Sequence, residues 1–150
     1  MAVEYLTDGG MIASPSAIRI RAPNIGSCVL AAANVAKDGT GALGTPFTPG
    51  SNGSMLLRVY FNSAQLSRAA NSAMTGCLFL TDSAGANPYF LAEIALPVVT
   101  GSTTAIGASR VISFAYDELF LPPGVLLKAS ISVYAGVQDR IVVVAVGGNF

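Results

Sequence analysis

The feature that most limits the possible folds of this chain is an alternation of apolar and polar residues near its end. From Val125 to Tyr134 the odd-numbered residues are all apolar, and the even-numbered residues are mostly polar. Because successive side chains of a β-strand point to opposite faces, this alternation predicts a strand. One face of that strand is expected to enter a core and the other to meet solvent.

Similar stretches recur along the chain, and their β-branched and aromatic residues are typical of strands. Turn-forming residues separate them, as in Asp82–Pro88 and Leu121–Gly124, where proline fixes φ and glycine supplies positive φ. The expected strands are Ala17–Arg21, Cys28–Ala36, Ser54–Phe61, Gly76–Thr81, Tyr89–Val99, Ser109–Tyr116, Val125–Tyr134 and the apolar run near the end. About eight strands, with at most one short helix within Asn62–Thr75, predict an all-β protein. The leading architecture is an antiparallel β-sandwich with jelly-roll topology, and a closed barrel is its main rival.

The chain has 150 residues, which fits one domain. Residues 1–16 show no steady period and are expected to form an N-terminal arm. Residues 17–150 are expected to form a single β-sandwich domain. Within it, Lys37–Gly53 is rich in glycine, proline and threonine and is long for an internal loop, so we expect it to be functional or flexible.

The apolar run Ile141–Val146 is apolar on both faces, so both faces have to be covered. It is expected to follow a hairpin loop at Ala135–Asp139. One face is expected to enter the core, and the other to be covered by another subunit or by an arm. The run is followed by Gly147 and Gly148, which are expected to let the chain leave the strand. The candidate subunit-interface residues are therefore Val142, Val144, Val146 and Phe150, the last expected to fill a pocket of a neighbour.

The sequence offers little for catalysis, and we expect no enzyme and no catalytic residue. Histidine is absent, which excludes a Ser-His-Asp triad, a Cys-His pair and histidine metal sites. The acidic neighbours Asp117 and Glu118 would point to opposite faces of a strand, which is unsuitable for a carboxylate pair. Asp38–Gly41 lacks the spaced ligands of a calcium loop and is interpreted as a turn. No cofactor and no metal ligand are expected.

Three further residues have expected structural roles. Glu93 lies in an otherwise apolar stretch and is expected at an exposed edge or paired with an arginine such as Arg110. Cys28 and Cys77 lie in apolar stretches and are interpreted as buried, reduced thiols, although a disulfide between them is an open alternative.

The small number and scattered placement of charged residues favour protein partners over nucleic acid. Charged residues make up 11% of the chain, against about 25% in an average soluble domain, and the formal net charge is zero. The basic residues are scattered, so nucleic acid is not an expected partner. No apolar run reaches the roughly 18 residues of a membrane helix, so no membrane partner is expected. We therefore interpret the apolar excess as core plus protein–protein interface. We expect the chain, which shows no signal peptide, to be a cytoplasmic product or one released by lysis.

The C-terminal part carries a family resemblance. Phe120–Ser130, a glycine-containing hairpin and then Val144–Phe150 resemble the ends of small β-rich head proteins of tailed bacteriophages. More narrowly, they resemble capsid decoration (cement) proteins. The resemblance covers about thirty residues and transfers no functional residue. It implies a homotrimeric structural protein of the virion that binds the capsid surface and clamps neighbouring subunits of the major capsid protein.

In that interpretation, residues 1–16 and 37–53 would touch the shell, and the sandwich edges would form the homotrimer. Three other classes remain open. The first is a trimeric receptor- or glycan-binding module of a phage tail fibre or spike. The second is a glycan-active enzyme, and the third is a bacterial or toxin-type sandwich without a phage link.

Overall fold

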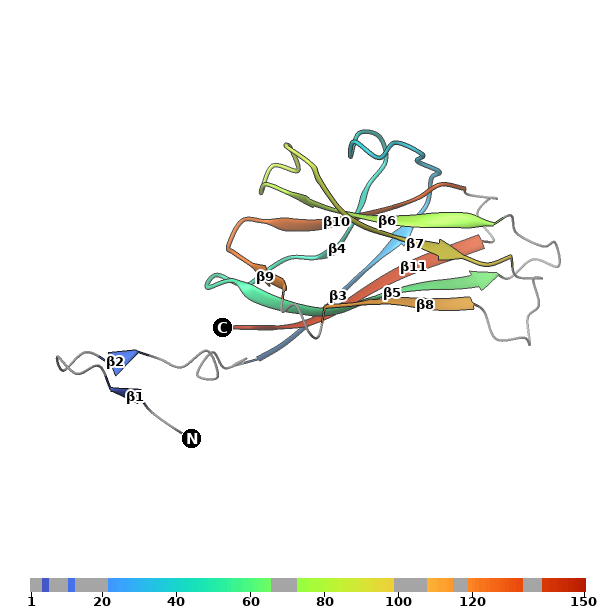
Figure 1. Ribbon diagram of the computed structural model, residues 1–150. Coiled ribbons are helices and arrows are strands. Elements are labelled where there is room, and N and C mark those ends of the chain that lie inside the picture. Colours follow the sequence, from blue (N-terminus) through green and yellow to red (C-terminus); the bar gives the residue numbers. More distant parts are fainter. Residues whose placement is uncertain are drawn as a thin grey trace.

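The structure is a computed structural model that describes residues 4–5, 11–12, 22–65, 73–98, 108–114, 119–133 and 139–150. Two antiparallel sheets lie face to face and enclose the core (Figure 1). The described residues contain no helix, and the predicted all-β sandwich is confirmed. Within the expected arm, β1 (Glu4–Tyr5) pairs with β2 (Met11–Ile12) outside the two sheets.

One sheet has five strands and the other has four. The five-stranded sheet runs in the order β3 (Ala22–Leu30), β11 (Asp139–Asn149), β5 (Ser54–Gln65) and β8 (Ala108–Ser113), and β9 (Leu119–Leu121) also pairs with β5. The four-stranded sheet runs in the order β4 (Gly44–Phe47), β10 (Leu126–Ile131), β6 (Met74–Thr81) and β7 (Tyr89–Leu96).

The pairing of these strands is nested. The first strand of the sandwich pairs with the last, the second with the second last, and so on inward. Thus β3 pairs with β11, β4 with β10, β5 with β8 and β9, and β6 with β7. This is the topology of a jelly roll, as predicted, and the two separate sheets exclude the closed barrel.

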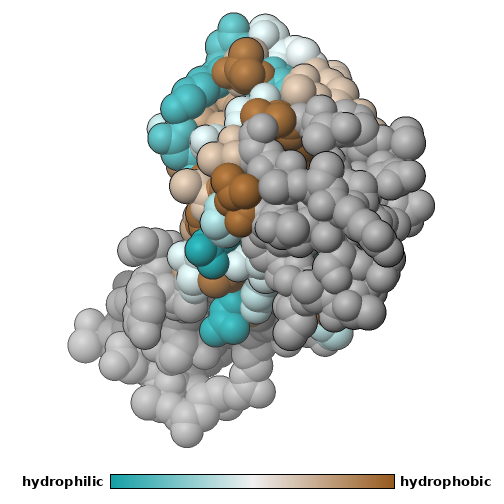
Figure 2. Space-filling model, turned by 90° about the vertical axis from the view of Figure 1, so that its right-hand side faces the viewer, coloured by the Kyte–Doolittle hydropathy of each residue, from teal (hydrophilic) through white to brown (hydrophobic). Residues whose placement is uncertain are grey.

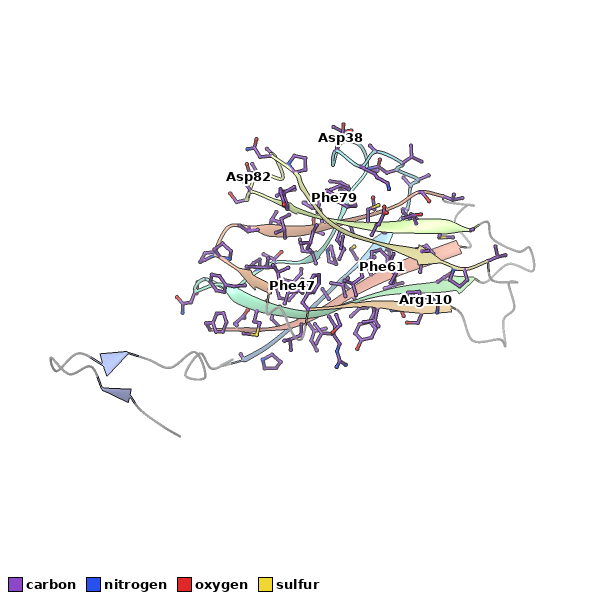
Figure 3. The ribbon with its side chains drawn as sticks, in the orientation of Figure 1. Asp38, Phe47, Phe61, Phe79, Asp82 and Arg110 are labelled. Carbon is purple, nitrogen blue, oxygen red and sulfur yellow. The ribbon has the colours of Figure 1, made fainter. Side chains whose placement is uncertain are left out.

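The core lies between the sheets and follows the predicted alternation. Leu127, Ala129 and Ile131 of β10 are fully buried, and so are alternate residues of β11. Phe47 and Phe61 fill the space between the sheets (Figure 3). The core cluster comprises Leu30, Phe47, Leu56, Val59, Phe61, Met74, Leu78, Leu96, Leu121, Leu127, Ala129, Ile131, Ile141, Val143 and Ala145.

The predicted bounds of one strand were wrong, and the stretch in which at most one short helix was expected is strand at both ends. The strand expected at Cys28–Ala36 is β3, which begins at Ala22 and ends at Leu30, because its register with β11 spans those nine residues. The helix expected within Asn62–Thr75 is replaced at both ends by strand. Asn62–Gln65 continues β5 and Met74 opens β6, because pairing with β11 and β7 outweighs weak helix propensity. The middle of that stretch, the strand expected at Ala17–Arg21 and most of the loop expected at Ala135–Asp139 lie outside the described residues.

The long segment Lys37–Gly53 is folded, and it contains β4. Residues 31–43 pack over the outer side of the four-stranded sheet, where Gly39 backs onto the rings of Pro88 and Phe79. Phe79 is therefore completely buried although it points away from the core, and Figure 3 shows it between the sheet and the loops above. We call residues 31–43 the cover. Because of the cover, the outward side of β10 is not the wet face that the alternation predicted: Ser130 is only 1% exposed.

Asn34 organises the cover. Its side-chain amide donates to the carbonyls of Thr40 (2.7 Å) and Ala42 (3.0 Å), and its side-chain oxygen accepts from the N–H of Ala36 (3.0 Å). The backbone N–H of Asn34 donates to the carbonyl of Ile131 at 2.7 Å and so ties the cover to β10.

The structure also shows the surroundings of Glu93 and of the turn predicted at Leu121–Gly124. Glu93 lies on the exposed edge strand β7, but its partner is Lys37 of the cover, at 2.5 Å, and not Arg110. Val125 donates to the carbonyl of Pro122 at 3.2 Å and Gly124 has φ 83°, which confirms the turn predicted at Leu121–Gly124.

Gly147 and Gly148 do not let the chain leave the strand, since both are paired inside β11. A Cβ on Gly147 would lie 2.2 Å from the carbonyl oxygen of Met55, next to the register shift between β11 and β5. The glycine therefore allows a close approach of two strand backbones.

Candidate functional site

The candidate functional site is the outward side of the five-stranded sheet, which we call the open face. It forms the underside of the lower layer in Figure 1. Its apolar side chains are Ile25 and Val29 of β3, Val142, Val144 and Val146 of β11, Met55 and Tyr60 of β5, Val111 of β8 and Phe120 of β9. Alternation along each strand places them there, because their sequence neighbours point into the core.

The strand register arranges these residues in rows across the sheet. Val142 lies between Val29 and Asn62, Val144 between Ser27 and Tyr60, and Val146 between Ile25 and Arg58. Three of the four predicted interface residues therefore form one apolar line along a central strand. Their role as a subunit interface stays a prediction.

The open face is accessible and almost without charge. Ile25 is 67% exposed, Val29 55% and Val111 46%, and the three valines of β11 are half-buried. Arg58 is the only charged residue among the described side chains on this face. The outer side of the other sheet differs, because the cover buries it. The end-on view in Figure 2 shows hydrophobic residues in a broken line beside a hydrophilic group at upper left.

Phe150, the fourth predicted interface residue, packs against its own chain. Its ring lies 5.5 Å from that of Phe120, its N–H donates to the carbonyl of Gly53, and its carbonyl accepts from the Asn52 amide. The two rings form an aromatic corner at the border of the open face. The expected insertion of Phe150 into a neighbouring subunit stays a prediction.

Sequence reasoning missed the residues that β3, β5 and β8 contribute to the open face. Ile25 was missed because the strand was placed three residues too late to include it. The sequence Asn24–Val29 gives no clear signal for it, because the alternation of exposed and half-buried residues there is visible only in the structure. Tyr60 and Val111 lay in predicted strands, but only the strand order shows that they flank Val144.

Two of the described carboxylates, Asp38 and Asp82, stabilise turns. Hydrogen bonds from the hydroxyl and N–H of Thr40 hold the pKa of Asp38 below its usual range, and this confirms the turn predicted at Asp38–Gly41. The N–H of Ala86 and the amide of Asn87 lower the pKa of Asp82 in the same way. Both aspartates lie on the loops above the covered sheet (Figure 3). Asp117 and Glu118 lie outside the described residues.

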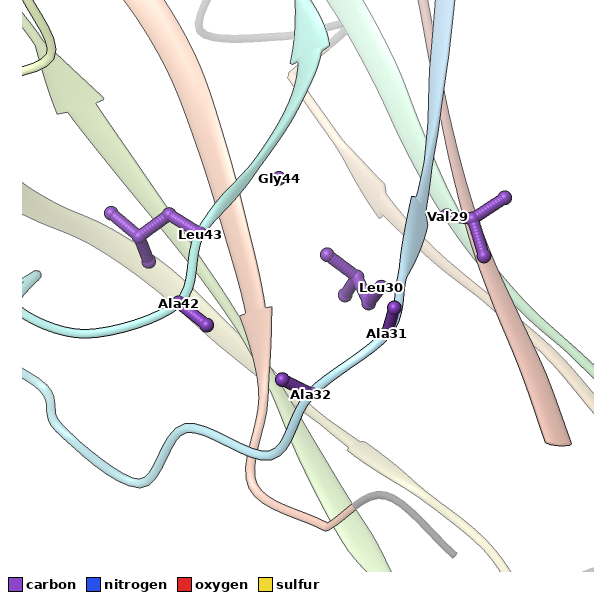
Figure 4. Close-up of a pocket in the computed structure, with 7 residues that line it drawn as sticks. All are labelled: Val29, Leu30, Ala31, Ala32, Ala42, Leu43 and Gly44. Carbon is purple, nitrogen blue, oxygen red and sulfur yellow. The ribbon is translucent and has the colours of Figure 1, made fainter. Parts of the chain in front are cut away.

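A shallow hollow lies at the end of β3, and its volume is about 230 Å³. Figure 4 shows Leu30, Ala32 and Ala42 lining it, with Val29 pointing away. The lining side chains are all apolar. Small-molecule sites need a few polar groups to fix the ligand, so this hollow has no chemistry of its own.

The two cysteines are free thiols. Cys77 is buried, as expected, and Cys28 is half-buried beside Gly44. Burial raises the pKa of the Cys28 thiol to about 11, against the opposing charge of the Lys128 ammonium. A thiol with so high a pKa is a weak nucleophile at neutral pH.

No group of three or more histidine, cysteine, aspartate or glutamate side chains that could hold a metal ion occurs in the part of the chain that the structure describes. The same part contains no helix long and apolar enough to cross a membrane. Comparison with protein-family models and with curated proteins found no match to this chain.

Proposed function

We propose that the chain is a structural protein of a virion that binds the outer surface of a bacteriophage capsid and stabilises contacts between major-capsid subunits. One observation carries the proposal. The chain covers the outer side of the four-stranded sheet with its own residues 31–43. The outer side of the five-stranded sheet, the open face, stays apolar and exposed. A large apolar and nearly uncharged surface is typical of one that is buried in an assembly.

The size of the open face suits such a role. Four strands spaced by about 4.8 Å, with about eight residues each at about 3.4 Å, cover roughly 500 Å². Burial of the open face against an equal area of a partner would remove about 1,000 Å² of solvent-accessible surface, counted over both proteins. This is at the lower limit for a specific interface. Repetition of such a modest contact over many equivalent capsid sites adds avidity.

The residues that resemble decoration proteins contribute directly to this surface. Phe120–Ser130 forms β9, the proline turn and β10, and Val144–Phe150 forms the end of β11. Phe120, Val144 and Val146 belong to the open face. Jelly rolls are frequent among viral capsid domains, but they also occur in lectins, so the fold supports the proposal only by analogy.

The segments proposed to touch the shell are narrowed by the fold. Residues 37–43 belong to the cover and pack against the chain's own sheet, and 44–47 form β4. The N-terminal arm, residues 1–16, and residues 48–53 stay proposed contacts with the shell. The homotrimer stays a prediction, which a mass measurement decides.

Co-sedimentation with capsid shells tests the proposal. The shells are assembled from a bacteriophage major capsid protein, and the protein to try first is any major capsid protein whose gene lies beside the gene of this chain. Wild-type protein is expected to sediment with the shells, and Val144→Asp on the open face to stay in the supernatant. Val35→Asp is the matched control, because Val35 is 77% exposed but lies on the cover. Deletion of Met1–Ser14 is expected to weaken binding.

The opposite result is equally clear. If wild-type protein fails to sediment with shells but binds host cells or glycan arrays, the capsid role is refuted. The receptor- or glycan-binding module of a tail fibre or spike is then the better interpretation.

A further inference from the structure

The described part of the sandwich has five edge strands, and four of them carry a feature that discourages the addition of another strand. The edge strand β9 is only three residues long. The edge strand β4 is only four residues long and contains Pro46. The edge strand β7 carries the ion-paired Glu93 and a register shift against β6. The edge strand β8 carries the exposed Arg110.

The remaining edge strand, β3, lacks such protection over most of its length. Its nine residues pair with β11 without a register shift, and none of them is charged. Pro23 lies near its start, before the exposed Ile25 and Val29. Within the described residues, the other edge of β3 makes no backbone hydrogen bond. A long, flat, apolar edge of this kind is a template for pairing with another chain.

We infer that β3 pairs edge to edge with β3 of a second copy, antiparallel and across a twofold axis. The sequence of the strand is self-complementary in one register. When Ser27 lies opposite Ser27 of the second copy, Ile25 lies opposite Val29 of that copy, and Val29 opposite its Ile25. Both exposed apolar side chains then gain an apolar cross-strand neighbour, which a shift by one residue would remove.

The second copy is the occupant that fits these observations. A zero net charge adds no repulsion between copies, and no residue of β3 brings like charges together. The contact would also join the two open faces side by side into one apolar surface of twice the width. A twofold contact cannot close a trimer by itself, so it predicts an even number of copies.

Cross-linking through Ser27 tests the register. Opposite residues of an antiparallel pair have Cα atoms about 4.5–5.5 Å apart, within the range of a disulfide. Ser27→Cys is therefore expected to form a covalent dimer under mild oxidation, seen on a non-reducing gel. The matched control is Ser109→Cys on β8, the other edge of the same sheet, and it is expected to stay monomeric on the gel. Equal cross-linking of both variants would overturn the inference.

Charge insertion tests the contact without a cross-link. Ser27→Lys is expected to halve the mass measured by light scattering, with an unchanged circular dichroism spectrum, and Ser109→Lys to leave the mass unchanged. A wild-type monomer or trimer, or an unchanged mass for Ser27→Lys, would overturn the inference.

These results are independent of the proposed function. A covalent dimer that fails to bind shells refutes only the capsid role, and shell binding without the dimer refutes only the edge contact.

Discussion

At the scale of single residues, a small polar cluster holds the end of the chain in place. The Ser54 hydroxyl, which is completely buried, donates to the side-chain oxygen of Asn149 at 2.5 Å and accepts from the N–H of Gly50 at 3.0 Å. The Asn24 amide donates to the same Asn149 oxygen at 2.8 Å. The cluster ties β3, β5 and β11 together around Asn149, so this end of β11 is held firmly in the fold.

Removal of the Ser54 hydroxyl should therefore weaken the whole sandwich. We expect Ser54→Ala to lower the free energy of unfolding by about 1–3 kcal/mol, because the N–H of Gly50 loses its acceptor in a buried setting. Urea denaturation measures the change. Ser83→Ala, at an exposed turn position, is the control and should shift the midpoint by very little. Equal effects of the two substitutions would contradict the role of the cluster.

The Cys28 thiol predicts a dependence of stability on pH. Burial raises its pKa from 9.0 to about 11, so the folded chain holds the proton more tightly than the unfolded chain. The resulting stabilisation is fully present below pH 9 and is lost as the pH rises through 11. We expect wild-type protein to lose more stability between pH 9 and 11 than Cys28→Ala, as measured by urea denaturation at each pH. Parallel curves would contradict this.

Individual residues also show how far the sequence can predict. The alternation of residues along the sequence correctly predicted which side chains of β10 and β11 are buried and which point outward. It could do so because alternation is a local property of a strand. The partner of Glu93 could not be predicted, because Lys37 reaches it from 56 positions away through the folding of the cover. The role of Gly147 depends in the same way on the carbonyl of Met55 on a neighbouring strand.

At the scale of elements, the cover depends on one side chain. Asn34 makes three hydrogen bonds within residues 34–42, and each contributes about 1 kcal/mol. We expect Asn34→Ala to open the cover without unfolding the sandwich. Trypsin should then cleave after Lys37 roughly tenfold to hundredfold faster, because cleavage follows the population of the open form.

The ion pair of the cover supplies the control. Lys37 and Glu93 are both largely exposed, and exposed pairs contribute about 0–1 kcal/mol. Glu93→Gln should therefore leave the rate of tryptic cleavage nearly unchanged. A cleavage rate that rises as much in Glu93→Gln as in Asn34→Ala would mean that the ion pair, and not Asn34, holds the cover closed.

The elements that sequence reasoning missed are those whose state depends on distant partners. The stretch Lys37–Gly53 was expected to be one long loop because of its glycine and proline content, yet Gly44–Phe47 pairs with β10. Asn62–Gln65 has residues compatible with a helix, but β11 extends the β5 ladder through them. Strand pairing across the sheet decides both cases, and a single sequence does not contain the pairing.

At the scale of the whole molecule, fold class could be predicted and strand order could not. Regular alternation and turn residues suffice to indicate an antiparallel sandwich. The nested pairing is needed to learn that β11 is central and that its second face is flanked by Ile25, Val29 and Tyr60. The doubly apolar run Ile141–Val146 pointed to a surface that must be covered, and the fold shows how wide that surface is.

Substitutions at two adjacent valines of β11 distinguish an effect on folding from an effect on assembly. Val143 is completely buried in the core, whereas Val144 is half-buried on the open face. Val143→Asp should cost more than about 4 kcal/mol and prevent folding, because it places an unpaired carboxylate in the core. Val144→Asp should keep the circular dichroism, the melting curve and the light-scattering mass of wild-type protein, but should no longer sediment with capsid shells. If Val144→Asp retains both the wild-type fold and shell binding, the open face is not the surface that binds the shell, and the apolar outer row of β11 needs another explanation.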